Sequence, residues 1–125
     1  MKILVAEDDP ISSMALEAQL KKQGYDVTIA ADGAAAWKKF QEERFPIVIT
    51  DWMMPVMDGI QLCKNIRAQG KPYACVLMLT AKQSREDKML ALSAGVDVFL
   101  SKPLSADVVI ARLQVARKIL EFEAA

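Results

Sequence analysis

The sequence predicts an α/β fold in which a parallel sheet carries helices on both faces. Five short apolar stretches alternate with five segments whose apolar residues recur at helical spacing. The third stretch, Ile47-Val48-Ile49, is apolar without interruption, which is typical of a parallel strand that is buried on both faces. Strands that alternate with helices build right-handed βαβ units, so this pattern predicts a doubly wound sheet.

The five expected strands are short and mostly apolar. They cover residues 2–6, 26–30, 46–50, 73–79 and 96–100. Each is bounded by turn-forming or helix-capping residues, as expected for strands in βαβ units.

Polar residues that cap helices precede each of the five helical segments. The expected caps are Asp9 (followed by Pro10), Asp32, Asp58, Ser84 and Ser105, and Gly24 and Gly95 are expected to end the first and fourth helices. The apolar faces expected to meet the sheet are Ile11, Met14, Ala15, Ala18 and Leu20; Ala36, Trp37 and Phe40; Ile60, Cys63 and Ile66; and Val109, Leu113, Ala116 and Leu120.

Length and charge limit the classes of function. A chain of 125 residues that is 53% apolar is expected to form one domain with its own core. The 16 basic residues balance the 16 acidic ones, so we expect no direct binding to nucleic acid or to an anionic membrane surface. No apolar run approaches the roughly 20 residues of a transmembrane helix. The N-terminus enters a strand at once, which predicts that there is no signal peptide and that the protein is cytoplasmic.

The cysteines and the absence of histidine limit the chemistry. Cys63 and Cys75 lie in apolar contexts without metal-ligand spacing, which favours reduced core thiols in a cytosolic protein. The chain contains no histidine, so a catalytic triad and a histidine metal site are excluded. If a phosphoryl group arrives from a phosphohistidine, another protein must supply it.

We read residues 1–125 as one domain, because the sequence has no linker or low-complexity segment. The last helical segment reaches the final residues without a clear stop signal. It either closes a free-standing domain or continues into an effector domain.

Polar side chains follow several of the expected strands. Glu7 and Asp8 come after the first strand, and Asp51 comes after the third. Thr80 and Lys102 follow the fourth and fifth strands. The carboxyl ends of parallel strands meet at one edge of the sheet, where open α/β sheets place their sites.

Three carboxylates in one crevice repel each other, and a divalent cation relieves that repulsion. Oxygen ligands without histidine or cysteine favour Mg²⁺, or Mn²⁺, over zinc. A carboxylate beside such an ion can attack an activated phosphoryl group and form an aspartyl phosphate. Lys102 offers an ammonium group and Thr80 a hydroxyl group to the phosphoryl oxygens.

The chain closely resembles the receiver domain of bacterial two-component response regulators, from residue 2 to about residue 120. The resemblance rests on Glu7-Asp8-Asp9, on Asp51 with Met54-Pro55-Val56-Met57-Asp58-Gly59, on Thr80-Ala81 and on Lys102-Pro103. It implies a flavodoxin-like sheet with the strand order 2-1-3-4-5.

The resemblance also implies a role for each site residue. Asp51 is the expected phosphoacceptor and a metal ligand, Asp8 binds Mg²⁺ directly and Glu7 acts mainly through a metal-bound water. The backbone carbonyl of Met53 is a further expected ligand. Thr80 and Lys102 hold the phosphoryl oxygens, and Ala81 is small enough to leave access to them. The Lys102–Pro103 peptide bond is expected to be cis, and Asp9 remains a helix cap.

Receiver domains switch when they are phosphorylated. Thr80 is expected to move toward the phosphate, while Phe99, on the fifth strand, moves into the vacated space. In the family the positions of Met53 and Lys82 tune the loss of phosphate. Methionine cannot orient a water molecule, so we expect slow intrinsic hydrolysis.

The expected function is that of a phosphorelay signalling module. It accepts a phosphoryl group from a histidine kinase or phosphotransfer protein and catalyses its own phosphorylation and dephosphorylation, without turning over a separate substrate.

The expected kinase contacts are Ile11, Met14 and Ala15 with the loop after Lys102, and the output face is formed by the fourth helix, fifth strand and fifth helix. The sequence does not identify the effector. Residues 111–121 resemble the helix ahead of diguanylate cyclase domains, and a homodimer on phosphorylation is a further expectation.

Two other functions are compatible with parts of the pattern. A pseudo-receiver would bind partners without being phosphorylated. A phosphatase of the haloacid dehalogenase type also uses an aspartate nucleophile, a hydroxyl residue, a lysine and Mg²⁺. Such a phosphatase needs an acid two residues after the nucleophile, where this chain has Met53.

Overall fold

Five parallel strands form one sheet in the order β2-β1-β3-β4-β5. The computed structural model describes residues 1–81 and 84–124. The strands are β1 (Lys2–Ala6), β2 (Asp26–Ala30), β3 (Ile47–Asp51), β4 (Cys75–Thr80) and β5 (Val98–Ser101). The predicted strand order is confirmed, and every strand begins and ends within two residues of its predicted range.

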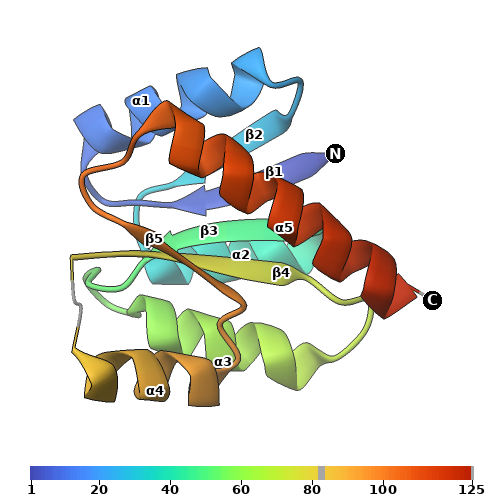
Figure 1. The fold of residues 1–125 in the computed structure, drawn as a ribbon. Helices are drawn as coiled ribbons and strands as arrows, with labels where there is room; N and C mark the ends of the chain where they lie inside the picture. The colour runs from blue at the N-terminus through green and yellow to red at the C-terminus, as the bar shows by residue number, and fades with distance from the viewer. Residues whose placement is uncertain (82–83, 125) are drawn as a thin grey trace.

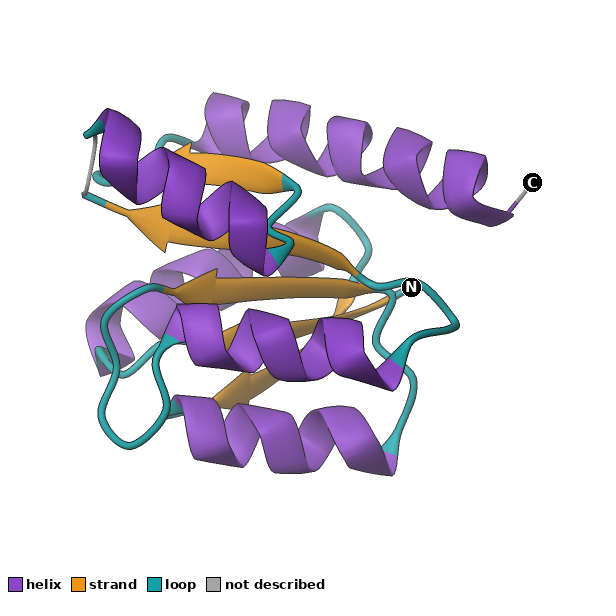
Figure 2. Ribbon diagram, turned by 90° about the horizontal axis from the view of Figure 1, so that it is seen from below, coloured by secondary structure: helices purple, strands orange, loops and turns teal. Residues whose placement is uncertain are grey.

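Helices cover both faces of the sheet, as the alternating pattern predicts. They are α1 (Pro10–Lys22), α2 (Gly33–Glu42), α3 (Gly59–Gln69), α4 (Arg85–Ala94) and α5 (Ala106–Ala124). Helices α1 and α5 lie on one face, and α2, α3 and α4 lie on the other (Figure 1). All the strands point the same way, and both chain termini lie at the end of the molecule away from the arrowheads (Figures 1 and 2).

Each helix layer closes its own part of the core. The α1 and α5 side contains Leu16, Leu20, Val109, Leu113 and Ala116 packed on alternate strand residues such as Val5, Ile49 and Leu77. The opposite side contains Ala36, Phe40, Ile60, Cys63, Ile66, Ala91 and Ala94 packed on Leu4, Val48, Val76 and Met78. The sheet is therefore buried on both faces, which explains its continuous apolar strands.

Helix caps set the points where loops become helices. The side chains of Asp9, Asp32, Asp58, Ser84 and Ser105 each accept a hydrogen bond from a backbone N–H in the first turn of the following helix. Gly95 ends α4 in the left-handed conformation. These caps match the predicted ones, because short polar side chains satisfy donors that the helix itself leaves open.

The predicted inner face of α1 is wrong apart from Leu20. Ile11 and Met14 are 79% and 67% exposed, and the buried residues of this helix are Ser13, Leu16 and Leu20. Ala15 and Ala18 are also exposed. The buried positions repeat at three and four residues, but one of them is a serine whose hydroxyl donates to the Pro10 carbonyl. The apolar pattern therefore indicated the wrong face.

A polar network fastens the amino-terminal ends of β4 and β5 to α3. The Arg67 guanidinium lies 2.6 Å from Asp97 Oδ2 and donates to the carbonyls of Ala74 and Gly95. Asp97 also accepts from the Tyr73 hydroxyl and from the backbone N–H of Val76. This network lies at the opposite end of the strands from the expected site.

The two cysteines are free and buried, which agrees with the prediction of core thiols. Burial raises the pKa of the Cys63 thiol to about 11 and that of the Cys75 thiol to about 12. Both thiols therefore stay protonated near neutral pH and act as apolar packing groups. No helix among the described residues is long and apolar enough to span a membrane.

Replacing Arg67 by alanine is expected to lower the free energy of unfolding by about 3 kcal/mol, because Asp97 and two carbonyls then lose a largely buried donor. Arg67→Lys keeps the charge but not the planar fork, so it should cause a smaller loss. Urea unfolding of the three proteins measures both effects. A loss below about 1 kcal/mol for Arg67→Ala would contradict this account of the network.

Candidate functional site

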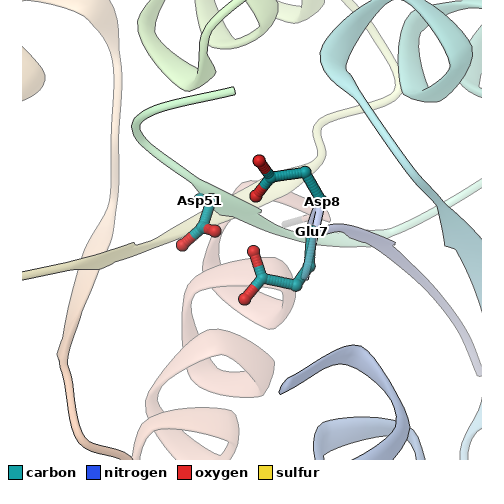
Figure 3. Close-up of side chains that lie close together, drawn as sticks. All are labelled: Glu7, Asp8 and Asp51. Carbon is teal, nitrogen blue, oxygen red and sulfur yellow. The ribbon is translucent and has the colours of Figure 1, made fainter. Parts of the chain in front are cut away.

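Three carboxylates meet at the carboxyl ends of β1 and β3. Glu7 and Asp8 directly follow β1, and Asp51 is the last residue of β3. These strands are neighbours in the sheet, with Ala6 in register with Thr50. One oxygen from each carboxylate lies within 4.8 Å of the others, and Figure 3 shows the three groups gathered around one space. The structure thus brings together the three acidic residues predicted to bind the metal.

Burial makes this cluster costly to keep ionised. Glu7 is 2% exposed and Asp51 is 5% exposed, whereas Asp8 is open to solvent. Among the described residues, neither carboxylate oxygen of Glu7 has a hydrogen-bond partner. A buried carboxylate without hydrogen bonds is unfavourable unless a cation is close to it.

Lys102 supplies part of the compensating charge. Its Nζ atom lies 2.6 Å from Asp51 Oδ1 and 3.5 Å from Glu7 Oε1, the latter as an ion pair without a hydrogen bond. The backbone N–H of Lys102 donates to the Thr80 carbonyl, and the Lys102–Pro103 peptide bond is cis. Lys102 thus pairs with two of the three carboxylates, and its single positive charge cannot balance the cluster when all three are ionised.

Burial and the nearby Lys102 have opposite effects on the pKa of the Asp51 carboxyl. Burial raises the pKa of the Asp51 carboxyl above its ordinary value, and the hydrogen bond and charge of Lys102 counteract part of that rise. A divalent cation beside Asp51 would favour the ionised form further.

Asp9 differs from its two acidic neighbours. Its carboxylate caps α1, and a hydrogen bond from the Ser12 hydroxyl is the main cause that lowers the pKa of Asp9. The structure therefore assigns Asp9 to the helix, as predicted, and leaves Glu7 and Asp8 to the site.

Most of the remaining predicted residues line a cleft beside Asp51, and Phe99 lies outside it. A cleft of about 170 Å³ is lined by Asp51, Trp52, Met53, Leu79, Thr80, Ala81 and Lys102. Thr80 is buried at the end of β4, next to β3 in the sheet. Phe99, on β5, is half-buried against the apolar core on the α2, α3 and α4 side. Lys82 lies outside the described residues.

The donor set fits Mg²⁺ or Mn²⁺. All the candidate ligands are oxygens, and two of the carboxylates are buried. Within the part of the chain that the structure describes, the Glu7 oxygens accept no hydrogen bond that would compete with an ion or its bound water. Glu7, Asp8, Asp51 and the Met53 carbonyl are the groups that would hold the ion. When bound, the ion would neutralise the cluster and the oxygens of an incoming phosphoryl group.

The sequence analysis did not predict two hydrogen bonds that hold the backbone at Asp51. The Thr50 hydroxyl donates to the Asp51 carbonyl, and the Trp52 N–H donates to the Leu79 carbonyl. Trp52 itself is buried in the core next to the site. The first contact is local, whereas the second joins segments far apart in the sequence and follows from the register of β3 and β4.

A parallel sheet with an acidic pocket, a hydroxyl group and a lysine at its carboxyl edge places this chain in the class of doubly wound α/β proteins that carry a site at that edge. Within that class the chain belongs to the response regulator receiver domain family, whose characteristic pattern matches residues 3–114.

Similar proteins support this assignment. The chain is 41% identical to the alkaline phosphatase synthesis transcriptional regulatory protein PhoP of Bacillus subtilis over 113 residues, which are 90% of this chain and 47% of PhoP. The chain thus spans about half the length of that relative. A Francisella response regulator receiver domain is 36% identical with a TM-score of 0.86, over 94% of this chain and 96% of that one.

A third similar protein was solved with a metal. The receiver domain of a Pseudomonas aeruginosa sensor histidine kinase, described with a magnesium ion coordinated in its active-site cleft, is 30% identical with a TM-score of 0.83. The match covers 96% of this chain and 97% of that one.

Replacing Glu7 by glutamine is expected to stabilise the metal-free protein by roughly 1–2 kcal/mol, because one buried negative charge leaves a crowded cluster. The same change should remove most of the stabilisation that Mg²⁺ gives to the native protein. Urea unfolding with and without Mg²⁺ measures both effects, and Glu42→Gln on the exposed surface is the matched control. Lower metal-free stability with an unchanged Mg²⁺ effect would contradict the role of Glu7.

Proposed function

We propose that this receiver domain accepts a phosphoryl group on Asp51 in an Mg²⁺-dependent reaction. The observation that carries the proposal is the arrangement around Asp51, where Lys102 Nζ lies 2.6 Å from its carboxylate and two further carboxylates share one metal-sized space with it. Neither feature alone implies phosphoryl transfer, but together they supply a nucleophile, a metal site and a mobile cation.

The proposed reaction transfers the phosphoryl group from nitrogen to oxygen. A carboxylate oxygen of Asp51 attacks the phosphorus atom of a phosphohistidine on a partner protein. The new P–O bond forms as the P–N bond breaks, and the imidazole leaves with the electron pair. Lys102 exchanges its ion pair with Asp51 for one with a phosphoryl oxygen, and the Thr80 hydroxyl donates to another. Hydrolysis of the acyl phosphate later restores the Asp51 carboxylate.

The proposed switch links Thr80 to Phe99. Thr80 ends β4 and Phe99 lies in β5, the strand paired with it. Movement of Thr80 toward a phosphoryl group would leave space beside the strand, and the half-buried Phe99 ring would fill it. Phenylalanine carries no hydroxyl group, so its inward position gains packing without a hydrogen bond.

Two exposed surfaces suit the incoming and outgoing signals. Ile11 and Met14 lie in the first turns of α1, shortly after the acidic pair Glu7 and Asp8, which favours this helix as the contact for a histidine kinase or phosphotransfer protein. The outgoing surface would be α4, β5 and α5, where Met89, Leu90, Leu92, Val108 and Val115 are exposed apolar residues.

The identity of the output is part of the proposal. The chain spans about half of its B. subtilis relative, so an effector domain in the same protein is one arrangement and a separate partner protein is the other. We further propose an effector of the diguanylate cyclase type and a homodimer that forms on phosphorylation. We also propose a cytoplasmic location, where a histidine kinase could reach Asp51.

Two alternatives are weaker. A pseudo-receiver would not need the complete set of Glu7, Asp8, Asp51 and Lys102 that the structure brings together. A phosphatase of the haloacid dehalogenase type needs an acid two residues after the nucleophile, where the exposed Met53 stands.

Incubation with acetyl phosphate and Mg²⁺ is expected to add one phosphoryl group to the wild-type chain and none to Asp51→Asn, because the amide is not a nucleophile. Intact mass spectrometry measures the gain, and omission of Mg²⁺ should prevent it. The fluorescence of Trp52 should change as metal binds, measured in a Trp37→Phe background since the chain has two tryptophans. A gain in the Asp51→Asn variant, or none in the wild type, would contradict the proposal.

Replacing Met53 by asparagine is expected to accelerate loss of the phosphoryl group several-fold. Met53 is exposed and lines the cleft beside Asp51, where an amide can orient an attacking water and a thioether cannot. The decay of the phosphorylated mass after removal of acetyl phosphate gives the rate. Met53→Leu, which also cannot orient water, should keep the native rate, and equal rates for all three proteins would count against this role.

A further inference from the structure

The loop between β3 and α3, residues 52–58, carries the Met53 carbonyl, one of the groups that would hold the metal ion on which the proposed function rests. The loop is anchored at its ends, where the Trp52 N–H donates to the Leu79 carbonyl and the Gly59 N–H donates to the Trp52 carbonyl. Between these ends the side chains of Met53 and Val56 are exposed, whereas those of Met54 and Met57 pack against the core. The position of the Met53 carbonyl therefore depends on these two packed side chains and on what the loop backbone rests against.

The loop backbone rests against Gly33, the first residue of α2. A Cβ atom built on Gly33 would lie 1.9 Å from the Met57 carbonyl oxygen and 2.8 Å from the Met57 carbonyl carbon. Both atoms belong to the backbone, so no side-chain rotation relieves the clash. Gly33 is buried and does not have a positive φ, so it provides room here and not an unusual backbone conformation.

Met57 has little freedom to move away from Gly33. Its side chain packs against the core on the α2, α3 and α4 side, and its sulfur lies 3.6 Å from Asn65 Nδ2. Its N–H donates to the Pro55 carbonyl. The preceding residue, Val56, adopts φ +71° although it is β-branched and 89% exposed. Such a conformation persists only where the surroundings hold the chain in place.

We propose that Gly33 is a positioning residue for the metal site. Its missing side chain lets the start of α2 fix the backbone at Met57, and the strained turn at Val56 transmits that position to the Met53 carbonyl. A Cβ atom at residue 33 must separate from the Met57 oxygen by more than 1 Å before it reaches even 3.0 Å. Mg²⁺ requires oxygen distances near 2.0–2.1 Å with little tolerance, so a shift of that size would weaken its binding.

The N-terminal cap of α2 also helps to hold Gly33 in position. Asp32 accepts a hydrogen bond of 2.7 Å from the Ala35 N–H and so holds the first turn of α2, with Gly33, in place. Asp32 is not among the acidic residues that could bind the ion, so a change there acts on the metal only through the backbone or through long-range charge.

The first test measures Mg²⁺ binding by calorimetry, a readout that does not depend on phosphorylation. Gly33→Ala is expected to raise the Kd for Mg²⁺ by about tenfold or more, the range typical of groups that orient metal ligands. Gly24→Ala is the matched control, because Gly24 has a positive φ, open space around its Cβ position and a place in the α1–β2 turn at the far end of the sheet. It should lower stability but leave the Kd within about twofold of the wild-type value.

The second test avoids the steric clash and so keeps the chain folded. Asp32→Ala removes the cap and is expected to raise the Kd several-fold, whereas Asp32→Asn keeps an acceptor and should bind Mg²⁺ like the wild type. Both variants lose the same charge, so their difference reports the cap alone. Wild-type Kd values for both Gly33→Ala and Asp32→Ala would overturn the inference while leaving the metal site intact. Absence of Mg²⁺ binding by the wild type would overturn the metal site and the inference together.

Discussion

The structure depends on one electrostatic constraint, the meeting of three carboxylates at the carboxyl ends of two neighbouring strands. The order β2-β1-β3 places the chain after β1 beside the end of β3, where the connections of the sheet diverge. Glu7 and Asp51 are buried there, and Lys102 is the cation that the described residues bring to them. Burying these carboxylates without a metal is unfavourable, and in the proposed function Mg²⁺ and a phosphoryl group would relieve that cost.

The residues that fasten the fold lie at one end of the strands, and the candidate site lies at the other end. The amino-terminal ends of β4 and β5 are fastened by Arg67, Asp97 and Tyr73, all of which have their partners within the protein. At the carboxyl ends the Glu7 carboxylate has no hydrogen bond within the described residues, and in the proposed function Lys102 would leave Asp51 for a phosphoryl oxygen. The sheet between the two ends is buried on both faces.

Local signals in the sequence were sufficient to predict much of this arrangement. Strand positions, helix caps and the acidic cluster depend on residues close together in the chain and on the parallel topology, so their patterns are visible without coordinates. The inner face of α1 was mispredicted because Ser13 is buried with its hydroxyl satisfied locally while Ile11 remains in solvent. Contacts such as Arg67 with Asp97 and Gly33 with Met57 join segments more than twenty residues apart. They depend on how α2, α3 and the sheet pack together, which periodicity does not encode.

The most direct test of the central claim is a crystal structure of this chain grown with Mn²⁺ and measured at the manganese absorption edge. The account predicts one anomalous peak between β1 and β3, with oxygens of Asp8, Asp51 and the Met53 carbonyl about 2.0–2.3 Å away and Glu7 reached through water. A peak elsewhere, or a cluster of Glu7, Asp8 and Asp51 that stays free of metal at saturating Mn²⁺, would contradict it.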